Sequence, residues 1–260
     1  MITQKEMEMT SRRHLAIPFA TTLLLAAPAS APTQADPLAA DQRGEIEAII
    51  KNYLTQHPEV VQDALAELDK RQQAAEAEKH RKMVKENNAT LFSSPHQVVL
   101  GNPQGNVTMV EFFDYNCGYC KRALPDMLGL LKADPNLKFV LKEFPVLGEG
   151  SVDAAHVAVA VRMQDSTGKK YIEFHQKLLG GRGPVDKMRA LAVAKEVGLD
   201  MARIEKDMSS DEVKATIDEN MKLADALGVN GTPSYVVGNE VVMGAVGLDA
   251  LREKIDAERK

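Results

Sequence analysis

Cys117 and Cys120 are the only two cysteines of this 260-residue chain, and just two residues separate them. A secreted protein that is stapled by disulfides would carry several spaced pairs. A disulfide across Cys-Gly-Tyr-Cys would stabilise little, because closing so short a loop removes little chain entropy. The pair is therefore better explained by thiol reactivity than by structural cross-linking.

The sequence pattern places a strand before the cysteine pair and a helix after it, so Cys117 is expected at a helix N-terminus. There the unpaired backbone N–H groups and the helix dipole favour negative charge, which stabilises a thiolate. We expect Cys117 to be the attacking sulfur and Cys120, one turn further along, to be the buried resolving thiol. The two would exchange with a substrate disulfide through a mixed disulfide.

Half of a zinc site is the competing interpretation of a Cys-x-x-Cys motif. Such a site requires two more Cys or His ligands, and the chain has no further cysteine. The histidines are scattered without ligand spacing: His57, His80, His96, His156 and His175. We therefore expect no metal site and no cofactor.

The elements that must position the cysteines are predicted to form a parallel βαβ unit with a right-handed crossover. Apolar runs indicate its buried strands, and a Gly-Asn turn indicates a hairpin near the C-terminus. The expected elements, in chain order, are strands at 97–100, 107–114 and 138–144, a helical block at about 151–227, a hairpin at 234–237 and 240–245, and a helix from about 248.

Three segments in this order resemble the DsbA-type periplasmic thiol–disulfide oxidoreductases: residues 111–120, 142–145 and 228–233. The resemblance covers roughly residues 97–258. It implies an α/β fold of the thioredoxin-like type with an inserted helical domain, which agrees with the helical block. It also implies that Pro233 is cis and faces the cysteines, so that Thr232 presents backbone groups to an extended substrate chain.

Glu111 and Lys142 lie on the two strands of the βαβ unit, which we expect to be adjacent. The matching positions in the DsbA-type family lie beneath the active site and help proton transfer to or from the buried thiol. Because a buried charge is expected to be paired, the two residues are interpreted as an acid and a base that act on Cys120. An ordinary structural salt bridge is the alternative.

The dipeptide between the cysteines, Gly118-Tyr119, tunes the redox properties of the thiol pair. DsbA-type oxidases usually have Pro-His there, whereas DsbC-type isomerases have Gly-Tyr and a Thr before the cis-proline, as in Thr232-Pro233. This resemblance implies a disulfide isomerase or reductase that acts on cysteine-containing exported client proteins. It also implies that Gly118, Tyr119, Thr232 and Pro233 contact the client. The alternatives are a DsbA-like dithiol oxidase, a copper(I)-binding thiol protein, since soft thiolates suit that ion, and a holdase chaperone.

Residues 1–35 are predicted to be a cleaved signal peptide, with a basic start at Arg12-Arg13, a short apolar run and small residues near Ala35. Export to the periplasm is the expected consequence. A membrane redox partner would there keep the dithiol reduced.

Residues 36–92 are predicted to form a helical, charged stalk that precedes the DsbA-like domain at 93–258. Its start carries an apolar stripe without a partner in the same segment, which predicts a homo-oligomer, dimer or trimer, through residues 43–90. Such an extension before a Cys-Gly-Tyr-Cys domain is similar to the ScsC family. The formal net charge of −5 gives no indication of nucleic-acid binding.

Overall fold

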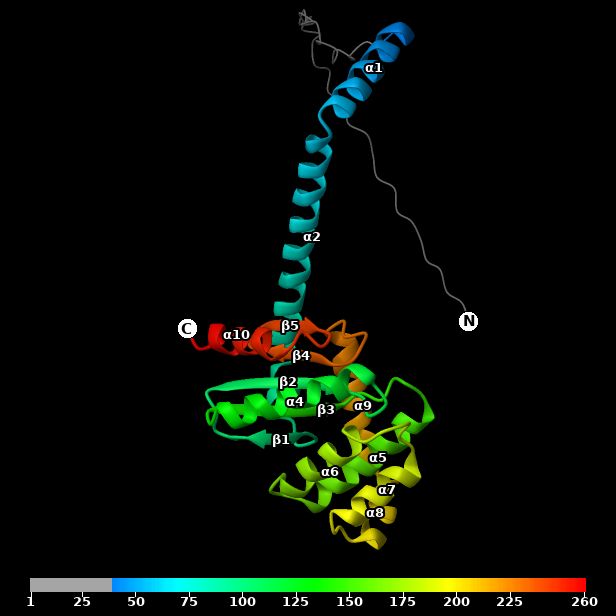
Figure 1. The fold of residues 1–260 in the computed structure, drawn as a ribbon, viewed down its shortest axis with the longest axis vertical. Coiled ribbons are helices and arrows are strands. Elements are labelled where there is room, and N and C mark those ends of the chain that lie inside the picture. Colours follow the sequence, from blue (N-terminus) through cyan, green and yellow to red (C-terminus); the bar gives the residue numbers. More distant parts are fainter. Residues whose placement is uncertain (1–38) are drawn as a thin grey trace, which may run out of the picture. The chain divides into compact units, whose positions relative to one another are not determined.

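The computed structural model describes residues 39–260, which belong to two compact units (Figure 1). The first unit ends at Val60 and the second runs from Val61 to Lys260. The predicted signal peptide, residues 1–35, lies outside the described residues. No helix within 39–260 is long and apolar enough to cross a membrane.

Helix α1 (Ala40–Gln56) makes up most of the described part of the first unit, and helix α2 (Pro58–Glu86) begins there. The break between them falls at His57, because the residue before a proline disfavours helix while Pro58 suits the first helical position. The apolar side chains of α1 are exposed: Ile46, Ile49, Ile50, Tyr53 and Leu54. The apolar stripe predicted from their spacing therefore faces solvent in a single chain.

A five-stranded mixed sheet in the order β1-β3-β2-β4-β5 organises the second unit. Strands β2 and β3 pair in parallel, which confirms the predicted βαβ unit, and the other pairs are antiparallel. Both parallel strands are buried along most of their length, so they have almost continuous apolar sequences. The strands are β1 (Val98–Gly101), β2 (Val107–Phe113), β3 (Leu137–Glu143), β4 (Ser234–Val237) and β5 (Glu240–Met243).

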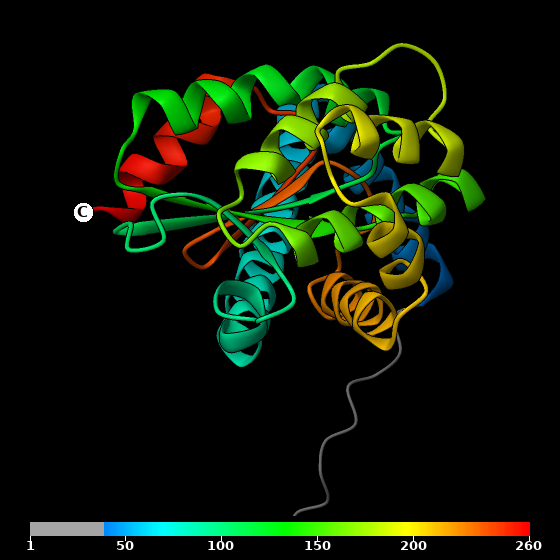
Figure 2. The same ribbon diagram turned by 90° about the horizontal axis from the view of Figure 1, so that it is seen from below.

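Helices cover both faces of this sheet, as Figure 2 shows. One face packs against α4 (Gly118–Ala133) and α10 (Leu248–Glu258). The other packs against α3 (Asn88–Phe92) and α9 (Asp211–Ala226), where Val84 of α2 joins the apolar cluster. The cysteines belong to the first of these two faces, because they open α4.

A helical insertion separates β3 from α9 and consists of α5 (Glu149–Gln164), α6 (Lys169–Leu179), α7 (Lys187–Glu196) and α8 (Met201–Asp207). Helix α5 is rich in Ala and Val and buries side chains along its length, so the other inserted helices and α9 pack around it. The predicted helical block after the βαβ unit is confirmed. The second unit is thus a thioredoxin-like fold with a helical insertion.

Candidate active site

Cys117 and Cys120 lie where strand β2 leads into helix α4. Cys117 is the N-cap residue of α4, and its Sγ accepts a hydrogen bond from the Cys120 N–H at 3.4 Å. Both residues are free thiols and both are buried, with exposed fractions of 6% for Cys117 and 0% for Cys120. The Cys117 sulfur thus occupies the position at which a helix stabilises negative charge.

The two thiols differ in acidity. The pKa of Cys117 is lowered from 9.0 to about 5, chiefly by the hydrogen bond with the Cys120 thiol and further by Thr232 and nearby backbone N–H groups, although burial opposes this. The pKa of Cys120 is raised, first by the same thiol–thiol hydrogen bond and then by burial. At neutral pH Cys117 is therefore a thiolate and Cys120 keeps its proton, the state that their predicted roles require.

The loop before strand β4 lies against the Cys117 sulfur. Its Thr232–Pro233 peptide bond is cis, as the family resemblance implies. The distance from the Cys117 Sγ to the Thr232 carbonyl oxygen is 3.1 Å. On the other side, the Gly244 N–H donates to the Pro233 carbonyl oxygen at 2.9 Å. The backbone around the cis bond is thus held beside the thiol pair.

Asp114, between strand β2 and the cysteines, organises the active-site loop. Its buried carboxylate accepts hydrogen bonds from the backbone N–H groups of Asn116, Val146 and Leu147 and from the Ser151 hydroxyl, at 2.7–3.0 Å. One side chain therefore joins three segments around Cys117. An acid that directly follows a buried strand and precedes Cys-x-x-Cys is the signal that could have singled it out in the sequence.

Asn116 connects the site to the inserted helices. The Val185 N–H donates to Asn116 Oδ1 at 2.7 Å, and Asn116 Nδ2 donates to the Val185 carbonyl at 2.9 Å. The segment between α6 and α7 is thereby held next to the residue that precedes Cys117. The partners are 69 positions apart, and no local pattern in the sequence relates them.

Glu111 lies on β2, on the face of the sheet that carries α4, and is 4% exposed. Burial raises its pKa from 4.5 to about 8, and the charge of Cys117 adds to this effect. The Glu111 carboxylate in turn contributes to the raised pKa of Cys120. A carboxyl group that titrates near neutral pH beside two thiols has the acidity that proton exchange with them requires.

Lys142 does not pair with Glu111, so the predicted acid–base pair is wrong. Strands β2 and β3 are adjacent as expected, but their register places Glu111 beside Leu141 and Lys142 beside Phe112. Since successive residues of a strand point to opposite faces, Glu111 and Lys142 lie on different sides of the sheet. Sequence alone did not define this register.

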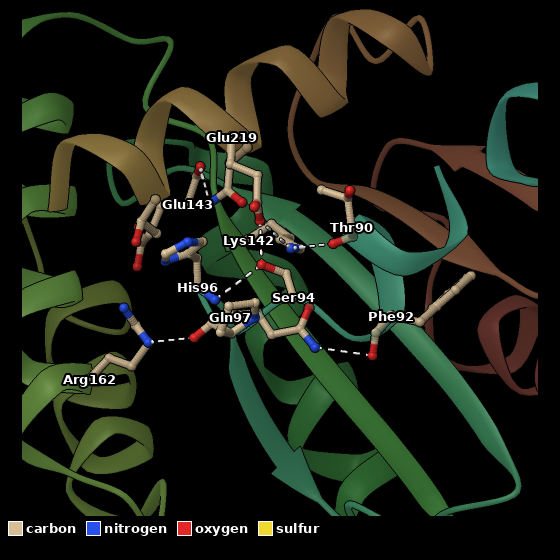
Figure 3. A network of polar contacts seen from close by, with 12 residues as sticks. Thr90, Phe92, Ser94, His96, Gln97, Lys142, Glu143, Arg162 and Glu219 are labelled. Carbon is tan, nitrogen blue, oxygen red and sulfur yellow. Dashed lines mark hydrogen bonds and ion pairs between the residues drawn. The ribbon is translucent and has the colours of Figure 1, made fainter. Parts of the chain in front are cut away.

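Lys142 belongs instead to a polar network on the α9 side of the sheet (Figure 3). Its Nζ lies 3.5 Å from Glu219 Oε1 and donates to the Thr90 carbonyl at 2.8 Å. Burial lowers its pKa to about 8, although Glu219 opposes this shift. Lys138 of the same strand donates to the Phe92 carbonyl at 2.6 Å. The two lysines therefore anchor helix α3 to the sheet, and Lys142 has a structural role.

A second buried polar group joins β3, the active-site loop and α6. The Tyr171 hydroxyl donates to Glu143 Oε1 at 2.6 Å, and the Tyr115 hydroxyl lies 3.3 Å from His175 Nδ1. Burial raises the pKa of Glu143 well above 4.5 and lowers that of His175 to about 3. His175 is therefore uncharged at neutral pH, and burial favours the uncharged form of Glu143, which lowers the cost of burying both groups beside the site.

Fold and site together define a thioredoxin-like protein whose Cys-x-x-Cys pair faces a cis-proline loop. Across residues 39–260, no three or more His, Cys, Asp or Glu side chains are grouped to hold a metal ion. The sequence model described as "DSBA-like thioredoxin domain" matches residues 108–256, and the chain belongs to this family of thiol–disulfide oxidoreductases. The model described as "Copper resistance protein ScsC N-terminal domain" matches residues 42–75, which confirms the ScsC-like resemblance.

Solved structures support the same assignment. A thioredoxin-like oxidoreductase from Silicibacter pomeroyi DSS-3 is 47% identical and covers 66% of this chain and 98% of its own, with a TM-score of 0.63. Proteus mirabilis ScsC in a transitional conformation is 26% identical and covers 85% of this chain and 98% of its own, with a TM-score of 0.62.

Among curated proteins, the probable disulfide bond formation protein D of Bacillus anthracis is 29% identical over 180 residues, 65% of this chain and 82% of that protein. The first curated relatives are two Na(+)/H(+) antiporters of Salinispora species, and the chain spans only 23% of their length.

Proposed function

We propose that this protein exchanges disulfides with client proteins and acts as a disulfide isomerase or reductase. The observation that carries the proposal is the acidic Cys117 thiol, with a pKa of about 5, whose Sγ lies 3.1 Å from the carbonyl oxygen of Thr232 in a cis-proline loop. A thiolate in this position attacks one sulfur of a client disulfide. The new bond joins Cys117 to the client, and the second client sulfur leaves as a thiolate.

Two outcomes follow from this mixed disulfide. In isomerisation another client thiolate attacks the client sulfur and releases Cys117, so no electrons are gained or lost overall. In reduction the Cys120 thiolate attacks the Cys117 sulfur, which releases a client thiol and leaves a Cys117–Cys120 disulfide. Glu111 supports this step as the acceptor of the Cys120 proton, because the Cys117 charge that helps raise its pKa to about 8 is absent in the mixed disulfide, which favours the ionised carboxylate.

Client binding is assigned to the surface around the thiol pair. Gly118 and Tyr119 are exposed, and the Tyr119 side chain is 60% exposed although aromatic. Thr232 and Pro233 border the Cys117 sulfur from the other side. An extended client segment that lies across these four residues would place its disulfide on Cys117.

A homo-oligomer, dimer or trimer, is part of the proposal, through residues 43–90. Ile49 is 67% exposed and Leu65 56% exposed, which is unusual for large apolar side chains at regular helical spacing. Several thiol pairs on one particle would let a client be attacked again before it diffuses away. Val84 is fully buried against the sheet, so the assembly segment is best tested by substitution in α1 and not by deletion.

The remaining parts of the proposal are the compartment and the electron donor. The predicted signal peptide supports a periplasmic location. A dithiol that is used up by reduction requires a source of electrons, for which we propose a membrane redox partner.

Refolding of a scrambled, disulfide-containing enzyme tests the proposed function. We expect the reduced wild-type protein to restore activity of the client, and Cys117→Ser to restore none beyond the uncatalysed rate. Equal yields from both proteins would contradict the proposal. Tight stoichiometric copper(I) binding without turnover would then favour the binding-protein alternative.

A further inference from the structure

The loop between α6 and α7, residues 180–184, forms one rim of the active site. Asn116 holds the Val185 backbone through two hydrogen bonds, at 2.7 and 2.9 Å, so this loop ends beside the residue that precedes Cys117. Its sequence, Gly-Gly-Arg-Gly-Pro, carries one long side chain, that of Arg182, which is exposed. The loop therefore carries an exposed guanidinium group at one border of the active site.

Two other cations fix the path of this loop through its backbone. Lys121 Nζ donates to the Gly183 carbonyl at 3.0 Å. The Arg189 guanidinium donates to the carbonyls of Arg182 and Pro184. A Cβ atom at Gly181 would meet the Arg189 guanidinium, so a larger residue there would require this side chain to shift. These contacts hold the loop in place and bring the charged side chains of Lys121 and Arg189 close to its backbone.

A fourth cation lies over the dipeptide between the cysteines. The Arg122 guanidinium carbon is 4.2 Å from the centre of the Tyr119 ring, in the geometry of a cation–π contact. A Cβ atom at Gly118 would lie 3.9 Å from Arg122 Nη1. Arg122 is exposed. It therefore carries its charge directly onto the surface that a client must cover.

These four residues, Lys121, Arg122, Arg182 and Arg189, are named here the basic rim. Elsewhere Arg162, Arg203 and Arg259 each bind a carboxylate. Within residues 39–260, by contrast, no member of the basic rim forms an ion pair. The acids at its border are exposed Glu149 and Asp186, and Asp186 accepts from the Arg189 N–H as a helix cap.

We propose that the basic rim selects client segments in which aspartate or glutamate flanks the reactive cysteine. The inference rests on the proposed exchange reaction at Cys117 and adds the chemistry of its preferred client. It follows from charge complementarity, because a rim of unpaired cations beside the nucleophile attracts carboxylates and repels lysine and arginine. The local sign is opposite to the formal net charge of the whole chain, −5.

The test uses the reduced full-length mature chain and three peptides that each carry a nitrothiobenzoate mixed disulfide. The peptides are identical except for the residues that flank the cysteine, which are Asp, Asn or Lys. Arg182→Glu is the informative variant, because only the backbone carbonyl of Arg182 takes part in holding the loop. Lys206→Glu is the matched control: this exposed residue of α8 undergoes the same charge change beyond the far end of α7.

We expect the wild type to react about tenfold faster with the Asp peptide than with the Lys peptide at low ionic strength, and this ratio to shrink with salt. Arg182→Glu should lower the ratio of the Asp-peptide rate to the Lys-peptide rate by at least about threefold. Arg182→Lys should keep most of the preference, and Lys206→Glu all of it.

A wild-type ratio near one overturns the inference, as does an equal loss in Arg182→Glu and Lys206→Glu. Binding of the wild type, but not of Arg182→Glu, to phosphatidylglycerol vesicles without any peptide preference would overturn it in favour of a membrane-facing rim. Failure to react with all three peptides would instead overturn the proposed exchange reaction and, with it, this inference.

Discussion

The Cys117 sulfur lies 3.1 Å from the carbonyl oxygen of Thr232, the residue on the N-terminal side of the cis peptide bond. The two residues are 115 positions apart, yet this contact brings the nucleophile and the backbone that would align a client to the same point. Thr232 also contributes a side-chain hydrogen bond that lowers the pKa of Cys117.

Thr232→Val should therefore raise the pKa of Cys117. Valine has nearly the shape of threonine but no hydroxyl group, so the thiolate loses one donor while the cis-proline loop keeps its packing. The rate of alkylation by iodoacetamide as a function of pH reports this pKa, with Cys120→Ser as the background so that one thiol reacts. An unchanged midpoint would show that the Thr232 hydroxyl has no part in stabilising the thiolate.

The stability of the reduced protein should depend on pH through Cys117. The pKa of Cys117 is about 5 in the folded protein and has its ordinary value of 9.0 in the unfolded chain. At pH values between the two, the unfolded chain therefore binds a proton that the folded chain does not. The free energy of unfolding should therefore rise with pH from about 5 to 9 and lose this contribution as pH falls through 5. Urea titrations of the wild type and of Cys117→Ser at a series of pH values measure this contribution. If the free energy of unfolding changed with pH in the same way for both proteins, the lowered pKa of Cys117 would be contradicted.

Glu111→Gln should remove a contribution of the opposite sign. The pKa of Glu111 is about 8 when folded against 4.5 ordinarily, so the folded chain holds the extra proton between these values. The stability of the wild type relative to Glu111→Gln should then fall as pH rises from 4.5 to 8, by a few kcal/mol. The same variant should slow reduction of insulin by about 10²-fold, because it cannot accept the Cys120 proton.

A normal rate of reduction in Glu111→Gln would contradict the role in proton transfer, whatever the stability curves show. Glu253→Gln, an exposed change on α10, provides the control for loss of one carboxylate.

Lys142→Met should leave disulfide exchange unchanged and alter only stability. The pKa of Lys142 is about 8 when folded against 10.5, so between these values only the unfolded chain holds the proton. The stability of the wild type relative to the variant should consequently rise with pH across this range. If a folded Lys142→Met protein exchanged disulfides much more slowly than the wild type, a purely structural role for Lys142 would be contradicted.

The elements that carry the thiols follow from local patterns, and this is why they could be predicted. The run Val107–Phe113 is almost continuously apolar because both faces of this strand are covered, and the run therefore predicts a buried strand. Gly238-Asn239 predicts the turn between β4 and β5. The position of Cys117 at a helix N-terminus follows from that order alone. The cis-proline partner of Cys117 required the family resemblance, because a Thr-Pro pair in isolation is ordinarily trans.

What could not be predicted depends on register and on distant contacts. A shift of one residue between β2 and β3 would have put Lys142 on the face of Glu111, and composition does not fix that shift. The loop that contains Arg182 reaches the active site only because the insertion folds back and Asn116 binds Val185. Such relations arise from packing in three dimensions.

The most direct test of the account is to trap the mixed disulfide. Cys120→Ser and Cys117→Ser are each incubated with a scrambled client, and adducts are counted by intact mass spectrometry after acid quenching. We predict client adducts on Cys120→Ser, since Cys117 attacks and Cys120 is no longer present to resolve the mixed disulfide, and none on Cys117→Ser. Adducts on Cys117→Ser at the same rate, or on neither variant, would contradict Cys117 as the nucleophile.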